Sequence, residues 1–343
     1  MMNIMIMAGG KGTRFWPRSV KTIPKQFLSF GSGPTLIQQT VDRFRRLVPD
    51  ERLFIAAPSA HIPLVTSQLP SLATEQIFIE PEQKGTAACI AYAAYSMLAK
   101  GDDRPIVFVP ADQYVADDDV YLAAIERAAQ AASAANSIVT LGIRPDRPDT
   151  GFGYMEIEPD EGEIETDAGD LLHKVKRFIE KPDAATAEVL IQQHNVYWNS
   201  GIVAWRPSSI MHHITQKEPE LWRPFKDHQG DAALAYAAIP ELSIDYAILE
   251  KTDEIRCIPI DCGWDDIGSW AAFRRHHVPD ADGNVAKGAI RLYESEGNTV
   301  YSETETLLIG VSDLIVVSTP HGLLVCHRSE EPRLKHWLNE SSR

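Results

Sequence analysis

The sequence predicts an α/β fold in which a doubly wound, mainly parallel sheet precedes a small all-β domain. Short apolar runs alternate with helical stretches from residue 1 to about 280, as strands and helices do in parallel α/β sheets. Residues 284–343 instead show short runs rich in β-branched residues and Leu. The length of 343 residues agrees with two domains, at roughly 150 residues per domain.

The strands predicted for the sheet are short, apolar and bounded by Gly, Pro or Asp, which is typical of strands buried on both faces. They are Asn3–Ala8, Leu53–Ala57, Ile106–Pro110 and Ile138–Ile143. The first strand has no basic segment before it and runs directly into Gly9-Gly10. We therefore expect a strand at the N-terminus and not a signal peptide.

Helical stretches separate these strands. The first helix is predicted from apolar residues that recur on one helix face, namely Ile37, Val41, Phe44 and Val48. Two further stretches are rich in Ala and long enough to form helices, namely Thr86–Ala99 and Val120–Ala135.

The C-terminal region is predicted to be all β. Its apolar runs are centred eight residues apart, on Leu292, Val300, Leu308, Val316 and Leu324. This spacing agrees with a meander of hairpins and equally with the coils of a β-solenoid. The polar segment 279–284 is turn-forming, so we expect one domain over residues 1–280 and another over 284–343.

Charge and composition exclude several classes of protein. The chain has 33 Lys and Arg against 48 Asp and Glu, a net charge of −15, and such an acidic chain repels nucleic acid. Its apolar runs are shorter than the roughly 18 residues of a membrane helix, so we expect no membrane partner. The four cysteines form no Cys-x-x-Cys pair, which indicates reduced thiols in a cytoplasmic protein.

A glycine-rich segment, Met7–Arg14, directly follows the first predicted strand. Its glycines let a ligand approach the backbone, and successive N–H groups can bind phosphate oxygens. The segment is not a Walker motif, and it is not a complete Gly-x-Gly-x-x-Gly fingerprint, because Phe15 stands at the third glycine position. Basic residues gather here in an otherwise acidic chain, namely Lys11, Arg14, Arg18, Lys21 and Lys25. A small anionic ligand is therefore expected.

Further segments continue along the chain in the order of a known family. The set is Gly9–Leu28 (GGKGTRFWPRSVKTIPKQFL), Val109–Asp112, Thr150–Tyr154, Phe178–Pro182, Trp198–Gly201, Ser243–Ala247 and Gly263–Trp270. In residues and spacing they resemble the sugar-phosphate nucleotidyltransferases, and among these the mannose-1-phosphate guanylyltransferases. The resemblance covers residues 4–270 and implies a Rossmann-like nucleotidyltransferase domain.

The resemblance implies transfer of GMP from GTP to mannose 1-phosphate, with GDP-mannose and pyrophosphate as products. It makes Arg14 and Lys25 catalytic, in a reaction between two anions where positive charge and positioning dominate. It assigns the cofactor Mg2+ to Asp112 and Asp266, and carboxylate oxygens are ligands that Mg2+ prefers. Asp265 is the alternative ligand, but its neighbour occupies the family position.

Binding residues are also implied by the resemblance. For the nucleotide they are Ala8, Gly9, Gly10, Lys11, Gly12, Thr13, Arg14, Gly85, Thr86 and Asp112. For the sugar phosphate they are Gly153, Glu180, Lys181, Asn199 and Asp245. The chain departs from the family where Gly85 replaces a common Asn and Gln113 replaces a usual His. Nucleotide binding is therefore implied more directly than selection of guanine.

The resemblance further implies that the C-terminal domain is a short left-handed β-helix that helps to form a homodimer. Longer relatives continue into an isomerase domain, so we expect no phosphomannose isomerase activity. Two alternatives stay open: a nucleotidyltransferase for another sugar 1-phosphate, such as glucose or a heptose, and a catalytically silent nucleotide-sugar-binding regulator. An enzyme is favoured because the charged residues of the chemical step are present, namely Arg14, Lys25, Asp112 and Asp266.

Overall fold

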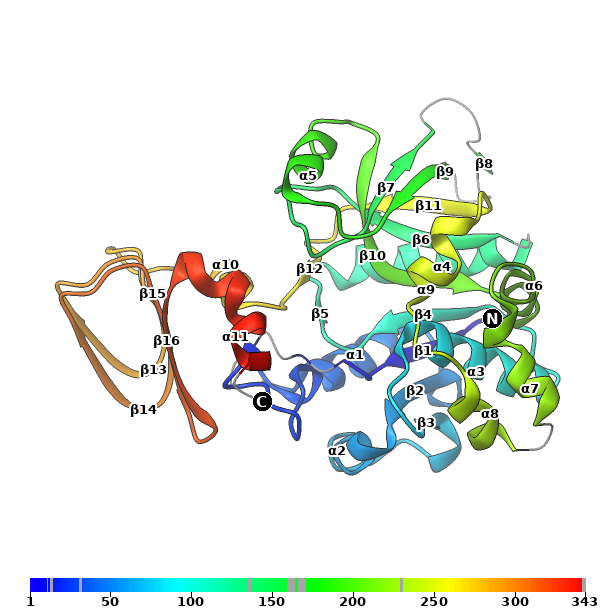
Figure 1. The fold of residues 1–343 in the computed structure, drawn as a ribbon, viewed down its shortest axis with the longest axis horizontal. Coiled ribbons are helices and arrows are strands. Elements are labelled where there is room, and N and C mark those ends of the chain that lie inside the picture. The colour runs from blue at the N-terminus through cyan, green and yellow to red at the C-terminus, as the bar shows by residue number, and fades with distance from the viewer. Residues whose placement is uncertain are drawn as a thin grey trace. The chain divides into compact units, whose positions relative to one another are not determined.

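The computed structural model describes residues 1–10, 12, 15–30, 33–134, 137–158, 164–165, 171–228 and 231–340. The chain forms two compact units, which are described separately (Figure 1). Unit 1 comprises Met1–Gly9, Gln38–Ala111 and Val115–Trp264, and unit 2 comprises Gly10–Ile37, Asp112–Tyr114 and Asp265–Arg343. Unit 2 thus joins two short segments from the first half of the chain to the C-terminal residues. The domain boundary expected at residues 280–284 stays a prediction.

Unit 1 is built on one mixed sheet. Its strands are β1 (Asn3–Met7), β2 (Leu53–Pro58), β3 (Ile77–Glu80), β4 (Ile106–Pro110), β6 (Ile138–Ile143), β7 (Tyr154–Ile157), β8 (Ile164–Glu165), β9 (Leu171–Ile179), β10 (Val196–Trp205) and β11 (Ile255–Ile260). Their order is β3-β2-β1-β4-β10-β6-β11-β9-β7, and β8 pairs with β9. The four strands from β3 to β4 are parallel, and β10 is antiparallel to both β4 and β6.

The four strands predicted from apolar runs are confirmed as β1, β2, β4 and β6. A parallel sheet is confirmed from β3 to β4, whereas from β10 onward the sheet is mixed. The antiparallel β10 was not predicted, because a local apolar pattern contains no information on strand direction. Its apolar run is also interrupted by the polar segment Asn199–Gly201, where the register with β6 shifts.

Helices cover both faces of this sheet. They are α1 (Leu36–Phe44), α2 (Ile62–Gln68), α3 (Gly85–Ala99), α4 (Asp118–Ala134), α5 (Ala184–Leu190), α6 (Pro207–Lys217), α7 (Arg223–Asp227), α8 (Ala232–Ala238) and α9 (Ile244–Ala247). Met5 and Phe108 share an apolar cluster with α3 on one face. On the other face α4 contacts β4, β6, β10 and β11, and its Tyr121 ring lies 6.0 Å from Phe44 of α1.

The predicted helices correspond to α1, α3 and α4, with one difference in length. Helix α1 ends at Phe44, so the buried Val48 lies in the turn that follows and not on the helix. Pro49 follows Val48 directly, and a proline disfavours the helical backbone conformation in the residue that precedes it.

Unit 2 contains two small sheets. Its elements are β5 (Gln113–Tyr114), β12 (Asp265–Asp266), α10 (Trp270–Arg275), β13 (Val285–Tyr293), β14 (Thr299–Ile309), β15 (Leu314–Thr319), β16 (Gly322–His327) and α11 (Leu334–Glu340). β5 and β12 pair antiparallel. In the C-terminal sheet β13, β14 and β15 are parallel neighbours, and β15 and β16 form an antiparallel hairpin.

The C-terminal strands confirm the predicted β structure, with two corrections. Val300 and Leu308 lie on one long strand, β14, and not on two. The region is not wholly β, because α11 follows the sheet. This helix has one short apolar stripe, Leu334 and Leu338, which packs on the core of unit 2. A stripe of two residues is too short to produce a detectable helical period.

The helices in the described part of the chain are too short or too polar to traverse a lipid bilayer. The four cysteines are free thiols, and Cys89, Cys257 and Cys262 are buried.

Candidate active site

A buried lysine contacts two carboxylates in unit 2. Lys25 starts a short 3-10 helix, Lys25–Phe27, and its side chain is 3% exposed. Its Nζ lies 3.1 Å from Asp112 Oδ2 and donates a hydrogen bond of 2.7 Å to Asp266 Oδ1. Burial alone lowers the pKa of the ammonium, but the two carboxylates outweigh burial and raise it. Lys25 is therefore a permanently charged group at a fixed position.

Two short strands bring the two carboxylates to this lysine. Asp112 directly precedes β5, and Asp266 on β12 pairs with Gln113 of β5. Gly12 has a φ of +58°, and a Cβ there would lie 2.7 Å from Cβ of Lys25. Glycine is therefore required at position 12 for the loop to pack against the lysine.

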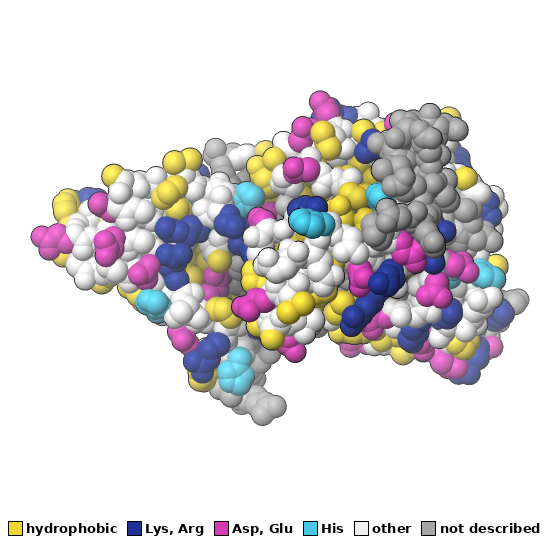
Figure 2. All heavy atoms as spheres, turned by 90° about the horizontal axis from the view of Figure 1, so that it is seen from above, with side chains coloured by type: hydrophobic (Ala, Val, Ile, Leu, Met, Phe, Trp, Pro, Cys, Tyr) yellow, Lys and Arg dark blue, Asp and Glu magenta, His cyan; other side chains and the backbone are white. Residues whose placement is uncertain are grey.

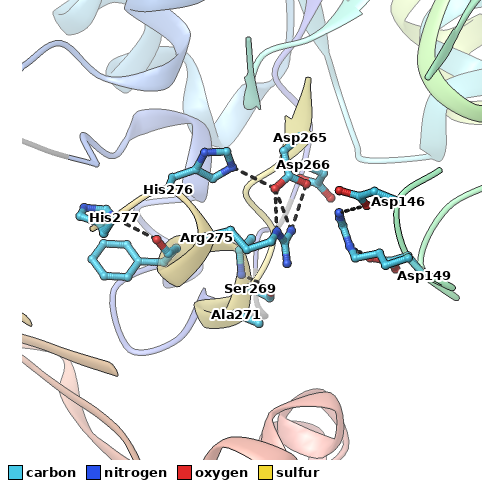
Figure 3. A network of polar contacts seen from close by, with 12 residues as sticks. Asp146, Asp149, Asp265, Asp266, Ser269, Ala271, Arg275, His276 and His277 are labelled. Carbon is cyan, nitrogen blue, oxygen red and sulfur yellow. Dashed lines mark hydrogen bonds and ion pairs between the residues drawn. The ribbon is translucent and has the colours of Figure 1, made fainter. Parts of the chain in front are cut away.

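Asp265, the neighbour of Asp266, has a different set of partners (Figure 3). Its carboxylate accepts hydrogen bonds from Arg275, with Nη2 at 2.8 Å and Nε at 3.1 Å from Oδ2, and lies 2.9 Å from His276 Nε2. The centre of the His276 ring lies 4.2 Å from that of Tyr114 on β5, with the two rings tilted by 43°. Because successive residues of a strand point to opposite sides, Asp266 points to Lys25 while Asp265 points to α10.

Part of the glycine-rich segment lies outside the described residues, namely Lys11, Thr13 and Arg14. In unit 1, Ala8 N–H donates to Ala56 O at 2.7 Å, and Gly9 O accepts a hydrogen bond from the Gln83 side chain. In unit 2, Gly10 O accepts from Gln26 Nε2 at 3.1 Å. The carbonyls of Gly9 and Gly10 are thus fixed by Gln83 and Gln26, respectively.

In unit 1, the segment implied to contact the base is tied to a second segment. Gly85 has a φ of +81°, and a Cβ there would lie 2.6 Å from Leu242 O. Thr86 Oγ1 accepts a hydrogen bond of 2.9 Å from Ile244 N–H. Since Asp245 follows Ile244 directly, the close approach of Gly85 and the hydrogen bond to the Thr86 side chain also position Asp245.

A buried carboxylate lies beside this segment. Glu80 at the end of β3 is 4% exposed and accepts a hydrogen bond of 2.7 Å from the hydroxyl of Tyr236. Burial raises the pKa of Glu80, and burial together with the Glu80 charge raises the pKa of Tyr236. A Cβ on Gly9 would lie 3.3 Å from Glu80 Oε2, so a side chain at position 9 would crowd this carboxylate.

The five residues implied to bind the sugar phosphate meet at one place in unit 1. Glu180 Oε2 lies 2.6 Å from where a Cβ of Gly153 would stand, so Gly153 leaves the space that this carboxylate fills. Asn199 N–H donates to Gly153 O at 2.8 Å, and Asn199 Nδ2 donates to Asp245 Oδ1 at 3.2 Å. Lys181 forms an ion pair with Glu180.

The amide of Asn199 has a defined orientation. Its Oδ1 accepts a hydrogen bond from Gly201 N–H at 3.2 Å and lies 3.1 Å from Thr140 Oγ1, whose single proton is shared with Ile202 O at 2.8 Å. Its Nδ2 therefore points to Asp245. Thr140 is thus a positioning residue for Asn199.

Burial, aided by the charge of Glu180, raises the pKa of Asp245 from 3.8 to about 6. The neutral form of this carboxyl is therefore favoured in the folded chain. Ionisation of Asp245 opposes folding, so its contribution to the free energy of unfolding falls as the pH rises from about 4 through about 6.

Residues 3–283 match a family described as Nucleotidyl transferase. The chain belongs to the nucleotidyl transferase family. It is 33% identical over 341 residues to the mannose-1-phosphate guanylyltransferase of Escherichia coli K12, covering 95% of this chain and 70% of the relative. It is 32% identical over 351 residues to the alginate biosynthesis protein AlgA of Pseudomonas aeruginosa, covering 98% and 71%. The crystal structure of mannose-1-phosphate geranyltransferase from Thermus thermophilus superposes with a TM-score of 0.89 at 28% identity, covering 100% of this chain and 99% of that one.

Several residues that contact predicted site residues or their neighbours were missed by the sequence analysis, namely Thr140 and Tyr236 in unit 1 and Arg275 and His276 in unit 2. Thr140 lies within an apolar strand and reads as an ordinary strand residue. Tyr236 and Glu80 are 156 positions apart, so no local pattern joins them. The sequence does contain a signal for Arg275 and His276. Basic side chains that follow the Asp265-Asp266 pair at the end of the next helix are candidate partners of those carboxylates.

Asp245 should give this nucleotidyl transferase a pH-dependent affinity for its sugar substrate. Below pH about 6 the carboxyl is neutral and accepts hydrogen bonds poorly, so kcat/KM for the sugar phosphate should fall by up to roughly tenfold per pH unit. Asp245→Asn should lack this acid limb and be less active at pH 8. The measurement is the difference between the pH profiles of kcat/KM for wild type and Asp245→Asn. The difference is needed because a substrate phosphate with a pKa of about 6 also titrates in this range, and it does so equally with both proteins. Identical acid limbs in wild type and Asp245→Asn would contradict a role for the Asp245 carboxylate in binding the sugar substrate.

Proposed function

We propose that this nucleotidyl transferase transfers GMP from GTP to mannose 1-phosphate, giving GDP-mannose and pyrophosphate. The observation that carries the proposal is the buried Lys25 ammonium in contact with Asp112 and Asp266, next to the glycine-rich segment of a nucleotidyl transferase. The choice of guanine and mannose is supported by the name and the coverage of the E. coli relative.

In the proposed reaction a phosphate oxygen of mannose 1-phosphate attacks the α-phosphorus of GTP in line with the departing pyrophosphate. The new O–P bond forms as the bond to the pyrophosphate oxygen breaks. We assign Lys25 to the α-phosphate oxygens, because a compact, fixed ammonium stabilises the charge that develops there. We assign Arg14 to the polyphosphate, whose oxygens a guanidinium can bind in pairs.

We propose binding roles for the remaining predicted residues. Ala8–Thr13, with the backbone N–H groups of a glycine-rich loop, would bind the phosphates of GTP. Gly85 and Thr86 would contact the base. Glu180, Asn199 and Asp245 would bind sugar hydroxyls, the backbone of Gly153 would approach a sugar hydroxyl, and Lys181 would pair with the sugar phosphate. The contacts among these five residues in unit 1 support this assignment.

Asp112 and Asp266 fit a magnesium site. Both are hard carboxylate donors, both contact the same lysine, and their side chains are 28% and 25% exposed. Mg2+ usually takes one or two protein carboxylates and completes its shell with waters and phosphate oxygens. Among the described residues no group of three or more His, Cys, Asp or Glu forms a larger candidate site. We propose that these two aspartates bind Mg2+, which when bound would neutralise phosphate charge.

The C-terminal strands support a β-helix. β13 and β14 are parallel although only residues 294–298 connect them, and 310–313 connect β14 to β15. Straight parallel strands need a connection of about a dozen residues or more, so these strands must bend back as coils. A bend is marked by Gly288, which has a φ of +123° where the register shifts. We propose a short left-handed β-helix.

We propose that the protein is a homodimer in the cytoplasm. Large apolar side chains are exposed on the C-terminal strands, among them Tyr293, Leu307 and Ile309. Figure 2 shows hydrophobic side chains at the molecular surface between charged ones. Exposed apolar side chains on neighbouring strands are typical of a surface that a partner covers. The four free thiols agree with a reducing compartment.

A matrix of nucleoside triphosphates against sugar 1-phosphates, assayed with Mg2+ by pyrophosphate release, tests the proposed function. GTP with mannose 1-phosphate should give the highest kcat/KM. The protein could instead prefer another pair, such as a thymidine nucleotide with glucose 1-phosphate or GTP with a heptose 1-phosphate. That result would keep the assignment as a nucleotidyl transferase and change the proposed substrates. Nucleotide-sugar binding without turnover of any pair would indicate the regulatory protein.

Lys25→Ala should lower kcat by roughly 10²–10³-fold, because it removes one fixed charge from the developing charge at the α-phosphate. The comparison is steady-state turnover of purified Lys25→Ala and wild type at saturating substrates. Lys21→Ala is the matched control, since Lys21 belongs to the same basic segment and is exposed. An unchanged kcat in Lys25→Ala would remove the lysine from the mechanism.

Asp112→Asn and Asp266→Asn should each raise the Mg2+ concentration needed for half-maximal activity, because each removes one charged ligand. If both bind one ion, the double variant should lose much less than the product of the two single losses. Asp253→Asn is the control, as an exposed aspartate. Asp265→Asn is unsuitable as a neutral control, because Asp265 binds Arg275 and His276. Fully multiplicative losses would show that the two carboxylates do not share a metal.

A further inference from the structure

The C-terminal sheet of unit 2 packs directly on the loop that follows the glycine-rich segment. We propose that this sheet positions the catalytic loop: the β15–β16 hairpin and Tyr301 hold Trp16–Arg18, and through this segment they fix Lys25. The inference rests on the proposed function, because it gives the C-terminal region a role in turnover beyond assembly. The residues concerned are Trp16, Pro17 and Arg18 on the loop and Tyr301, Thr319 and Gly322 on the sheet.

The hairpin contacts the loop at its turn. Gly322, the first residue of β16, has a φ of +153°, and a Cβ there would lie 2.8 Å from Cζ2 of Trp16. Thr319, the last residue of β15, donates a hydrogen bond of 3.2 Å from Oγ1 to Pro17 O. Thr319 and Gly322, on either side of the hairpin turn, therefore both contact the loop. Gly322 does so through close packing and Thr319 through a hydrogen bond.

Arg18 belongs to the basic segment expected to bind phosphate, but its contacts are with the loop and the sheet. Its guanidinium lies 4.4 Å from the ring centre of Tyr301 on β14 and 5.3 Å from that of Phe30. Its Nη2 donates a hydrogen bond to Ser29 O. A guanidinium stacked on an aromatic ring is attracted to it more strongly when both are shielded from water. Arg18 thus joins the loop to the sheet.

An apolar core continues this contact. The Phe15 and Trp270 rings stack at 4.1 Å and are fully buried, and Trp270 Nε1 donates to Trp16 O at 3.1 Å. Both rings share one cluster with buried residues of the sheet, namely Val285, Ile315, Val317 and Leu324. The loop and the sheet are therefore two sides of one core, and displacement of the sheet moves the loop.

The displacement would reach the lysine through short contacts within the loop. Phe15 N–H donates to Gly12 O at 3.1 Å, and Ser19 N–H donates to Phe15 O at 3.0 Å. A Cβ on Gly12 would lie 2.7 Å from Lys25 Cβ and 2.9 Å from Ser19 Oγ, so Gly12 is packed against both residues. A catalytic group displaced by about 1 Å can lose roughly 10²-fold in rate.

Gly322→Ala in the full-length protein tests the inference, because its methyl group would collide with Trp16. It should lower kcat roughly 10- to 100-fold with little change in KM, since an interaction of the transition state is lost. Gly322→Ala with Trp16→Phe should regain most of this loss, because Phe lacks the ring atoms in contact. Leu323→Ala is the matched control: Leu323 is the next residue of β16, is 61% exposed, and should leave kcat unchanged.

Two further measurements separate positioning from a general loss of stability. Thr319→Val keeps the shape of the side chain and removes the hydrogen bond to Pro17, so it should lower kcat roughly three- to tenfold even if Gly322→Ala folds poorly. In a Lys25→Ala background the same Thr319→Val change should cost less than about twofold, as expected for coupled residues. Mass by analytical ultracentrifugation and the thermal unfolding temperature of Thr319→Val should equal those of wild type.

Wild-type kcat in Thr319→Val and in a folded Gly322→Ala would overturn the inference, and so would an equal loss in Leu323→Ala. A kcat loss of the same size with and without Lys25 would also overturn it, because the sheet would then act independently of the lysine. Wild-type turnover of a pair other than GTP and mannose 1-phosphate would refute the proposed function alone. The kcat values of the same variants would then be measured with that pair of substrates.

Discussion

The contact of one buried ammonium with two carboxylates is the constraint on which unit 2 depends. Lys25, Asp112 and Asp266 come from three separate segments, and each segment is bent to reach the others. Removing Lys25 would leave two neighbouring carboxylates without their shared counter-charge, whereas removing one aspartate leaves the lysine paired with the other. The glycine at position 12, the β5–β12 pair and the packing of α10 are all consistent with keeping these charges together.

Neighbouring carboxylates take different tasks because their surroundings differ. Strand alternation directs Asp266 to Lys25, whereas Asp265 is bound by Arg275 and His276 and so fixes β12 to α10. In unit 1, Asp245 is half-buried, and desolvation together with the charge of Glu180 raises its pKa to about 6. Residue type alone therefore does not determine the role of an aspartate in this protein. The groups within hydrogen-bond distance and the depth of burial determine it.

The sequence predicts most clearly what local physical rules control. The buried strands β1, β2, β4 and β6 follow from unbroken apolar runs, and the sugar-side residues, implied by resemblance alone, do lie together. Strand direction, as for β10, depends on long connections and cannot be obtained from a run of residues. Thr140 and Arg275 act through side-chain hydrogen bonds, to Asn199 and to Asp265 respectively, and such contacts leave no periodic pattern. The packing of the C-terminal sheet on Trp16 likewise joins residues some three hundred positions apart.

The pairing of Gly85–Thr86 with Leu242–Ile244 has a consequence for altering specificity. The segment implied to contact the base packs through Gly85 on Leu242 and accepts a hydrogen bond from Ile244 through the Thr86 side chain, and Ile244 leads into Asp245, one of the residues implied to contact the sugar. A substitution that moves one segment to admit a different base will also move the carboxylate on the other. With the proposed roles of Gly85–Thr86 and Asp245, base and sugar selectivity are mechanically linked, and engineering a new nucleotide with an unchanged sugar would require compensating changes in both segments.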